Sequence, residues 1–365
     1  DPADVPRLAQ EMPWFEPKLD VRPLPDWETL PYDVLSPQEE LVSERLEALY
    51  RLTAPTGGAD VLLTSAVTAS QRLSPVSYIG ANTFFFHQGE QISLTTLQKR
   101  LAAAGYANVK QVLAAGEFAV RGSIVDVFPM GSERPFRLDF FDDEIESIRW
   151  FDVDTQRSME SAEEIRLLPG HEFPVDPEAL LAFRQRWRRE FAGDPKKSIV
   201  YCDIEKEILP PGIEYYLPLF FDETAALTDY LPPNARVFLL GDIEAALQAF
   251  GRDMASHYKV LAADPQRPAL APERIWLKPE EFFKSLANFA RFTVEEKENA
   301  EDLKRLTGIE VDRKSQNPVG KLLERTRESA MKGVRTLIAA PSAGRMETMS
   351  QLLRTGGLSV EEFPD

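Results

Sequence analysis

The hexapeptide FRLDFF at 136–141 combines charged and aromatic residues in an alternating pattern and is the first candidate for a functional surface. Strand alternation would put three apolar side chains on one face, which we expect to be the core: Phe136, Leu138 and Phe140. The other face would then carry Arg137, Asp139 and Phe141. An aromatic ring beside charged groups is the composition of a protein-binding hot spot, which is enriched in aromatic residues and arginine. The chemistry predicted for this face is the docking of another protein.

A second strand pattern brings another arginine to this face. Gly131 marks a hairpin loop between a strand over 119–128 and the strand over 136–141. If the hairpin pairs Phe128 opposite Phe136, the partner strand adds four side chains to the docking face: Arg121, Ser123, Val125 and Val127. Arg121 and Phe141 would then be near neighbours. On the pattern alone we prefer the alternative, in which Phe141 packs under a neighbouring domain and the arginines keep the sheet edge soluble.

No set of residues suits catalysis, nucleotide binding or metal binding. The phosphate-binding loop of P-loop ATPases needs the spacing GxxxxGK[ST]; the single Gly-Lys pair, Gly320-Lys321, is followed by leucine and lacks the first glycine. The run DDE at 142–144 could bind a divalent ion, but it lies between two strands, where a solvated turn is the better interpretation. The three histidines lie far apart, and no serine stands in a nucleophile elbow. We therefore expect no catalytic, cofactor or metal site in this chain, although a P-loop could have stood upstream of it.

The composition argues against a membrane span and against broad binding of nucleic acid. The chain has 365 residues, 43% of them hydrophobic. No apolar run approaches the ~20 residues that a bilayer crossing needs. The single cysteine, Cys202, excludes an internal disulfide and suits a reducing cytoplasm. The net charge of −17 repels a phosphate backbone, so any DNA binding should be weak and salt-sensitive. We expect a monomeric, cytoplasmic protein.

Helix and strand signals divide the chain into regions. Ser36 opens a capping box with proline at the first helical position, which predicts a helix to about Leu52. Further helices are predicted over 93–104 and 177–191, after Asp242, from Pro318 and after Ser342. Apolar or alternating runs predict strands, in addition to the two above, at 61–64, 145–151, 237–240 and 336–340.

These elements predict an α/β fold with an insertion. The two halves of the α/β domain are 1–73 and 161–293, and a small α+β domain, 74–160, is inserted between them. A charged and weakly apolar stretch, 294–317, is predicted to be a linker. A further small α/β domain follows at 318–365.

Four long stretches carry a resemblance to a known family. They are DWETLPYD at 26–33, GEFAVRG at 116–122, FPMGSE at 128–133 and RLDFFDDEI at 137–145. In these stretches the chain resembles the bacterial transcription-repair coupling factors (Mfd), most strongly over 105–174. The resemblance implies that the chain is the family's UvrB-like amino-terminal module. That module is a degenerate helicase-like α/β domain of the P-loop NTPase type, split by the inserted domain.

The resemblance also implies a partner, and it therefore favours an exposed, protein-binding Phe141 over one that packs under a neighbouring domain. It implies that the inserted domain binds UvrA in nucleotide excision repair through Arg121, Arg137 and Phe141, with Asp139 on the same face. The ATP and Mg²⁺ of such a protein, and its contacts to DNA and stalled RNA polymerase, would belong to motor domains outside this chain.

Three alternatives stay open. One is UvrB itself, which should carry an intact P-loop and a tyrosine-rich hairpin, whereas only Tyr32 and Tyr50 stand between Trp27 and Val61. Another is a P-loop ATPase or helicase fragment whose nucleotide site lies upstream. The third is a structural brace for the motor.

Overall fold

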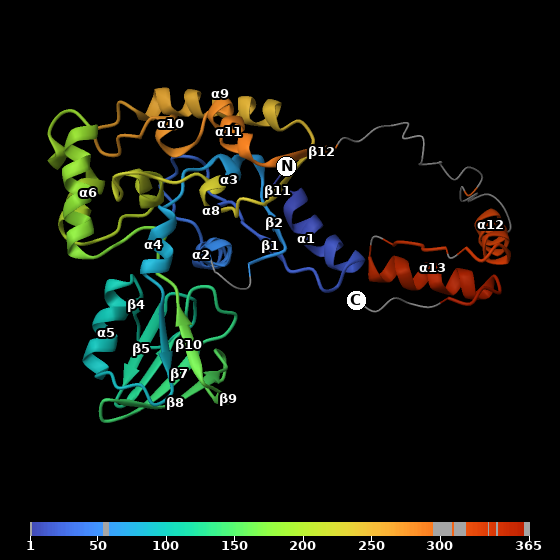
Figure 1. The fold of residues 1–365 in the computed structure, drawn as a ribbon, viewed down its shortest axis with the longest axis horizontal. Coiled ribbons are helices and arrows are strands. Elements are labelled where there is room, and N and C mark those ends of the chain that lie inside the picture. Colours follow the sequence, from blue (N-terminus) through green and yellow to red (C-terminus); the bar gives the residue numbers. More distant parts are fainter. Residues whose placement is uncertain are drawn as a thin grey trace. The chain divides into compact units, whose positions relative to one another are not determined.

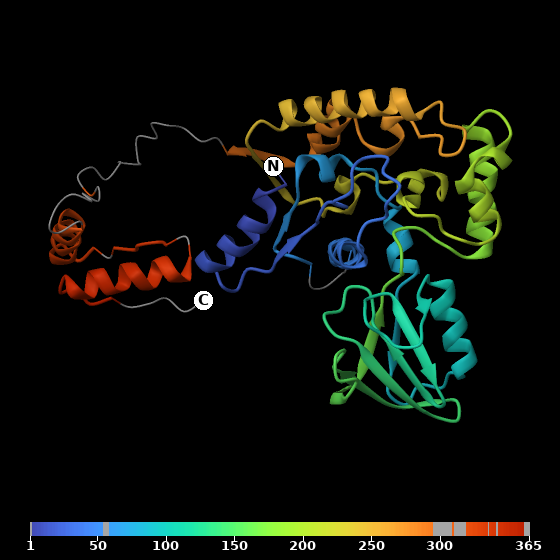
Figure 2. The same cartoon turned by 180° about the vertical axis from the view of Figure 1, so that it is seen from behind.

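The chain forms two compact units, 1–295 and 296–365. The structure is a computed structural model that describes residues 2–53, 58–294, 309, 319–334, 336–340 and 342–360. The first unit contains an α/β body and an inserted lobe, which Figures 1 and 2 show from opposite sides. In the described part of the chain, no helix combines the length and apolar character that a bilayer crossing requires.

The body is built on two short parallel sheets with helices around them. Strand β1 (Val21–Pro23) pairs with β2 (Val61–Leu63), and β11 (Arg236–Leu240) pairs with β12 (Ala290–Val294). Both predicted strands, at 61–64 and 237–240, are therefore confirmed, whereas β1 was not anticipated. The body has a mixed α/β architecture with several small sheets. The helicase-like fold of the α/β body stays a prediction.

The helices of the body start where local hydrogen bonding favours them. Asp176 caps α6 and Asp242 caps α9, each by accepting backbone N–H groups of the first turn. The capping box predicted at Ser36 is wrong, because α2 begins at Glu39. The Ser36 hydroxyl instead donates to Glu214 and accepts the N–H of Gly212. The helices are α1 (Asp4–Phe15), α2 (Glu39–Thr53), α3 (Ala66–Ser70), α4 (Val76–Ala81), α6 (Pro177–Glu190), α7 (Ile199–Glu205), α8 (Leu227–Tyr230), α9 (Ile243–Leu261), α10 (Pro272–Ile275) and α11 (Pro279–Ser285), with 3₁₀ turns at Pro195–Lys197, Ile213–Leu219 and Leu286–Asn288.

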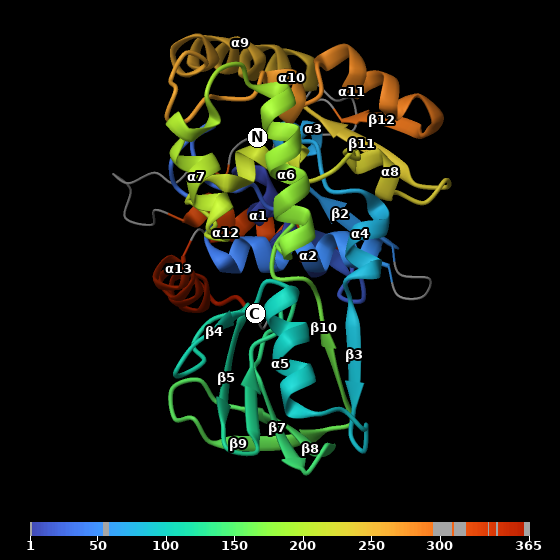
Figure 3. The same ribbon diagram turned by 90° about the vertical axis from the view of Figure 1, so that its left-hand side faces the viewer.

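The inserted lobe is a six-stranded sheet with one helix. Its strands follow the order β4 (Ala107–Asn108), β5 (Glu117–Arg121), β6 (Ile124–Val127), β7 (Phe136–Phe141), β8 (Glu144–Phe151) and β9 (Ser158–Ala162). Helix α5 (Leu94–Ala103), predicted over 93–104, is capped by Ser93 and lies against one face of this sheet (Figure 3).

Two antiparallel strands connect the lobe to the body. The chain leaves the body through α4 and β3 (Phe84–His87) and returns through β10 (Glu164–Leu167), which pairs with β3 (Figure 3). The inserted domain was predicted to end at residue 160, and β10 lies after that boundary. One hydrophobic core joins lobe and body, since Leu46 and Leu49 of α2 share it with Leu138 of β7. The lobe is therefore held firmly on the body.

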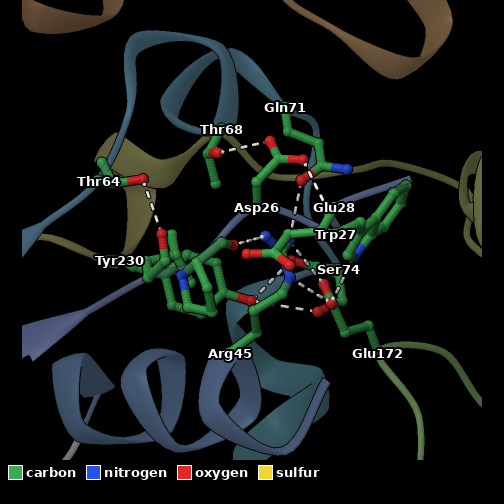
Figure 4. A network of polar contacts seen from close by, with 12 residues as sticks. Asp26, Trp27, Glu28, Arg45, Thr64, Thr68, Gln71, Ser74, Glu172 and Tyr230 are labelled. Carbon is green, nitrogen blue, oxygen red and sulfur yellow. Dashed lines mark hydrogen bonds and ion pairs between the residues drawn. The ribbon is translucent and has the colours of Figure 1, made fainter. Parts of the chain in front are cut away.

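A buried polar network fixes the segment that follows β10 (Figure 4). Arg45 of α2 is completely buried and donates from Nε to Glu172 at 2.6 Å and from Nη2 to Gln71 at 2.9 Å. Trp27 donates its indole N–H to the same Glu172 carboxylate at 3.0 Å, and the Arg45 guanidinium lies 5.3 Å from the Trp27 ring centroid. A buried pair of this kind is stable only when its remaining donors and acceptors are satisfied. Here they tie the exit of the lobe to three parts of the body.

In its described residues the second unit is a helix pair, α12 (Gly320–Met331) and α13 (Ala343–Thr355). Its core includes Leu323 of α12 and Leu353 of α13, and Ser342 caps α13 as predicted. The strand predicted at 336–340 is wrong, because these residues are irregular and the described residues of the unit contain no strand with which they could pair. The α/β character of this unit stays a prediction. Except for 294 and 309, the predicted linker at 294–317 lies outside the described residues.

Candidate protein-docking site

The hairpin expected over 119–128 and 136–141 contains an additional turn. Gly122 adopts φ +63° and, with Ser123, forms a two-residue turn between β5 and β6, so the single strand expected at 119–128 is wrong. The expected register is wrong by one residue, since Val127 and not Phe128 lies opposite Phe136. Val125 and Val127 therefore belong to the core face, and the side chains that join the docking face from β6 are Ile124 and Asp126.

Strand β7 separates core from solvent as its alternation predicts. Phe136, Leu138 and Phe140 are buried in the main core of the unit, with Phe140 only 6% exposed. Phe141 is 69% exposed, although it is the next residue along the strand. The alternative in which Phe141 packs under a neighbouring domain finds no covering group in the described part of the unit.

A buried carboxylate that the sequence analysis missed organises the two arginines. The Asp126 side chain is fully buried on β6, opposite Arg137 of β7. Arg137 donates to it twice, from Nε to Oδ1 at 2.6 Å and from Nη2 to Oδ2 at 2.9 Å. Arg121 donates from Nη2 to the same Oδ2. The two arginines that the alternation placed on one face are thus joined through one acid.

The arginines differ in how much of each reaches solvent. Arg137 also donates from Nη1 to the carbonyl of Gln156 and to Ser158 Oγ, both at 3.2 Å, and only 14% of its side chain is exposed. Hydrogen bonding to Asp126 raises the pKa of the Arg137 guanidinium, which therefore remains charged. Arg121 has 48% of its side chain exposed.

Backbone pairing brings the exposed groups to one end of the sheet. The N–H of Phe140 donates to the carbonyl of Ser123 at 2.8 Å, so the β5–β6 turn lies beside the end of β7. This turn follows Arg121 directly, and Phe141 ends β7. Asp139, on the same face of β7, accepts the Ser147 hydroxyl at 2.9 Å. Arg121 and Phe141 therefore lie at the same corner of the sheet, and Arg137 and Asp139 lie on the same face of β7 as Phe141. Their role in binding stays a prediction.

The acidic run at 142–144 lies where the chain turns from β7 into β8. Residues 142 and 143 make the turn between β7 and β8, with Asp142 at φ +51°. No cluster of three or more His, Cys, Asp and Glu side chains with metal-binding geometry occurs among the residues that the structure describes.

Comparison with known proteins shows which domain family the lobe matches and which proteins the chain resembles. A family model described as the UvrB interaction domain matches residues 84–173, a range that contains every residue of the docking face. The chain is 43% identical to the transcription-repair-coupling factor of Escherichia coli over 286 residues. This chain is homologous to transcription-repair-coupling factors. The predicted resemblance is thereby confirmed.

Two further transcription-repair-coupling factors show how the match is distributed. That of Haemophilus influenzae is 39% identical over 92% of this chain, and that of Bacillus subtilis is 32% identical over 55% of it. The aligned part covers 25% of the E. coli protein and 29% of the H. influenzae protein. The chain therefore spans about a quarter of the length of these transcription-repair-coupling factors.

Proposed function

We propose that this chain is a non-catalytic docking module that binds UvrA through the corner formed by Arg121 and Phe141. The observation that supports the proposal most strongly is the 69% exposure of Phe141, which ends a strand whose other face is core and lies at the same end of the sheet as the half-exposed Arg121. An apolar ring of this size exposed next to an organised charge is typical of an interface anchor. The match of residues 84–173 to a UvrB interaction domain supports a repair protein as the partner.

Within a full transcription-repair-coupling factor, such a module would recruit UvrA to lesions where RNA polymerase has stalled. Binding of ATP and Mg²⁺, translocation on DNA and displacement of the polymerase are assigned to parts of the protein outside this chain. The module would supply specificity for the repair partner and no chemical step of its own. We propose that it acts in the cytoplasm as a monomer.

The proposal is tested by isothermal titration of purified UvrA into the chain, with UvrB as competitor. If the lobe presents a UvrB-like surface, saturable binding should be lost when UvrA is first saturated with UvrB. Binding that UvrB leaves unchanged would place the contact elsewhere on UvrA. No binding at tens of micromolar protein would remove the proposal.

A further inference from the structure

The hydrogen bonds of the docking face divide its two arginines by role. A guanidinium has five N–H donors in a fixed plane. Arg137 uses four of them within the chain: two toward Asp126, one toward Gln156 and one toward Ser158. The Phe151 ring covers its guanidinium at 5.0 Å. Arg137 therefore has little left to offer a partner.

Arg121 is in the opposite situation. Within the residues that the structure describes, it makes one hydrogen bond, to Asp126, and keeps four donors for another acceptor. Nearly half of its side chain is exposed, and the turn at Gly122 carries it to the corner of the sheet. It is the better placed of the two arginines to meet a carboxylate from outside.

The Asp126 side chain has no exposed surface, so its carboxylate cannot contact a partner directly. Its Oδ2 accepts from both arginines, and its Oδ1 accepts from Arg137. Holding a long arginine side chain in place before binding reduces the ordering penalty at the moment of association. The carboxylate can therefore influence binding only through the arginines that it holds.

We infer that Arg121 is the arginine that contacts the partner, through a carboxylate on the partner's surface, while Asp126 and Arg137 are positioning residues that hold it ready. This inference rests on the proposed function, because it takes UvrA as the partner. It adds Asp126 to the site and moves Arg137 from the contact surface to its support.

A double-mutant cycle with purified UvrA and the full chain tests the positioning role. Asp126→Asn, which preserves shape, should weaken binding by roughly tenfold, and Arg121→Ala by at least as much. In the Arg121→Ala background, Asp126→Asn should have an effect of less than about twofold, since interacting residues are not additive. In the Phe141→Ala background it should keep its full effect. Equal effects of Asp126→Asn with and without Arg121 would overturn the positioning role.

The salt dependence of affinity tests the division between the arginines without requiring Asp126→Asn to fold. An exposed ion pair across an interface makes binding salt-dependent. Arg121→Ala should therefore flatten the dependence of affinity on NaCl concentration, whereas Arg137→Ala should lower affinity and leave the slope unchanged. A flattened slope for Arg137→Ala would show that Arg137 contacts UvrA and would refute the division. Absence of binding by the unmodified chain would instead count against the proposed function.

Discussion

Two adjacent phenylalanines of β7 should respond to the same substitution in opposite ways. Phe140 is 6% exposed within the main core, on a strand paired on both sides. Truncating such a ring removes its transfer free energy and leaves a cavity, so Phe140→Ala should lower the stability of the lobe by ~3–5 kcal/mol. Phe141 is 69% exposed, and Phe141→Ala should change stability by about 0.5 kcal/mol or less.

Hydrogen exchange of peptides from β7 and β8 measures this difference locally. Because each ~1.4 kcal/mol is a factor of ten in an equilibrium constant, Phe140→Ala should reduce protection of these strands by roughly two to four orders of magnitude. Leu138→Ala, also in the core, should act in the same direction, whereas Phe141→Ala should match the parent chain. Strong loss of protection in Phe141→Ala, with Phe140→Ala unaffected, would mean that the two faces of β7 are inverted.

Other predictions concern buried ionisable side chains of the first unit. Burial raises the pKa of Glu214 to about 7, so between pH 4.5 and 7 the folded chain keeps a proton that the unfolded chain has lost. The stability that protonated Glu214 contributes should therefore be full below pH 4.5 and should fall by on the order of 3 kcal/mol as the pH rises toward 7. The free energy of unfolding of Glu214→Gln, measured in urea, should not show this fall. Burial lowers the pKa of His171 to about 4, so the stability that neutral His171 contributes is full above pH 6.5 and is lost as the pH falls toward 4. In urea unfolding, His171→Gln should therefore lose less stability between pH 6.5 and 4 than the parent chain. Arg45→Met should lower stability by ~3–5 kcal/mol, because it leaves the buried Glu172 carboxyl without its guanidinium partner, and adding Glu172→Leu should recover most of that loss in the same assay.

The strand faces could be predicted from sequence because one of them is buried. Alternation over 136–141 is clear, since Leu138 and Phe140 enter a core while their neighbours do not. The N-caps at Asp242 and Ser342 could also be predicted, since a cap depends on three or four consecutive residues.

The missed features depend on pairing that a single sequence does not display. Gly122 could have continued a strand or turned it, and only the partner strand decides which. Asp126 lies among valines and meets arginines 5 and 11 residues away, so its role becomes visible only once the register is known. The apolar run at 336–340 has the composition of a strand, but strand formation requires a neighbour that the described residues do not provide.

Whether the chain binds UvrA through Phe141 is decided by measuring the affinity of purified UvrA for the chain and for Phe141→Ala. Phe85→Ala is a matched control, because Phe85 is another exposed phenylalanine of the lobe, 44% exposed on β3 and outside the docking corner. Phe141→Ala should weaken UvrA binding by ~2 kcal/mol or more, which is a factor of roughly thirty in affinity, while Phe85→Ala should bind UvrA like the parent chain. Equal affinities for the parent chain and Phe141→Ala, or a comparable loss in Phe85→Ala, would contradict this prediction.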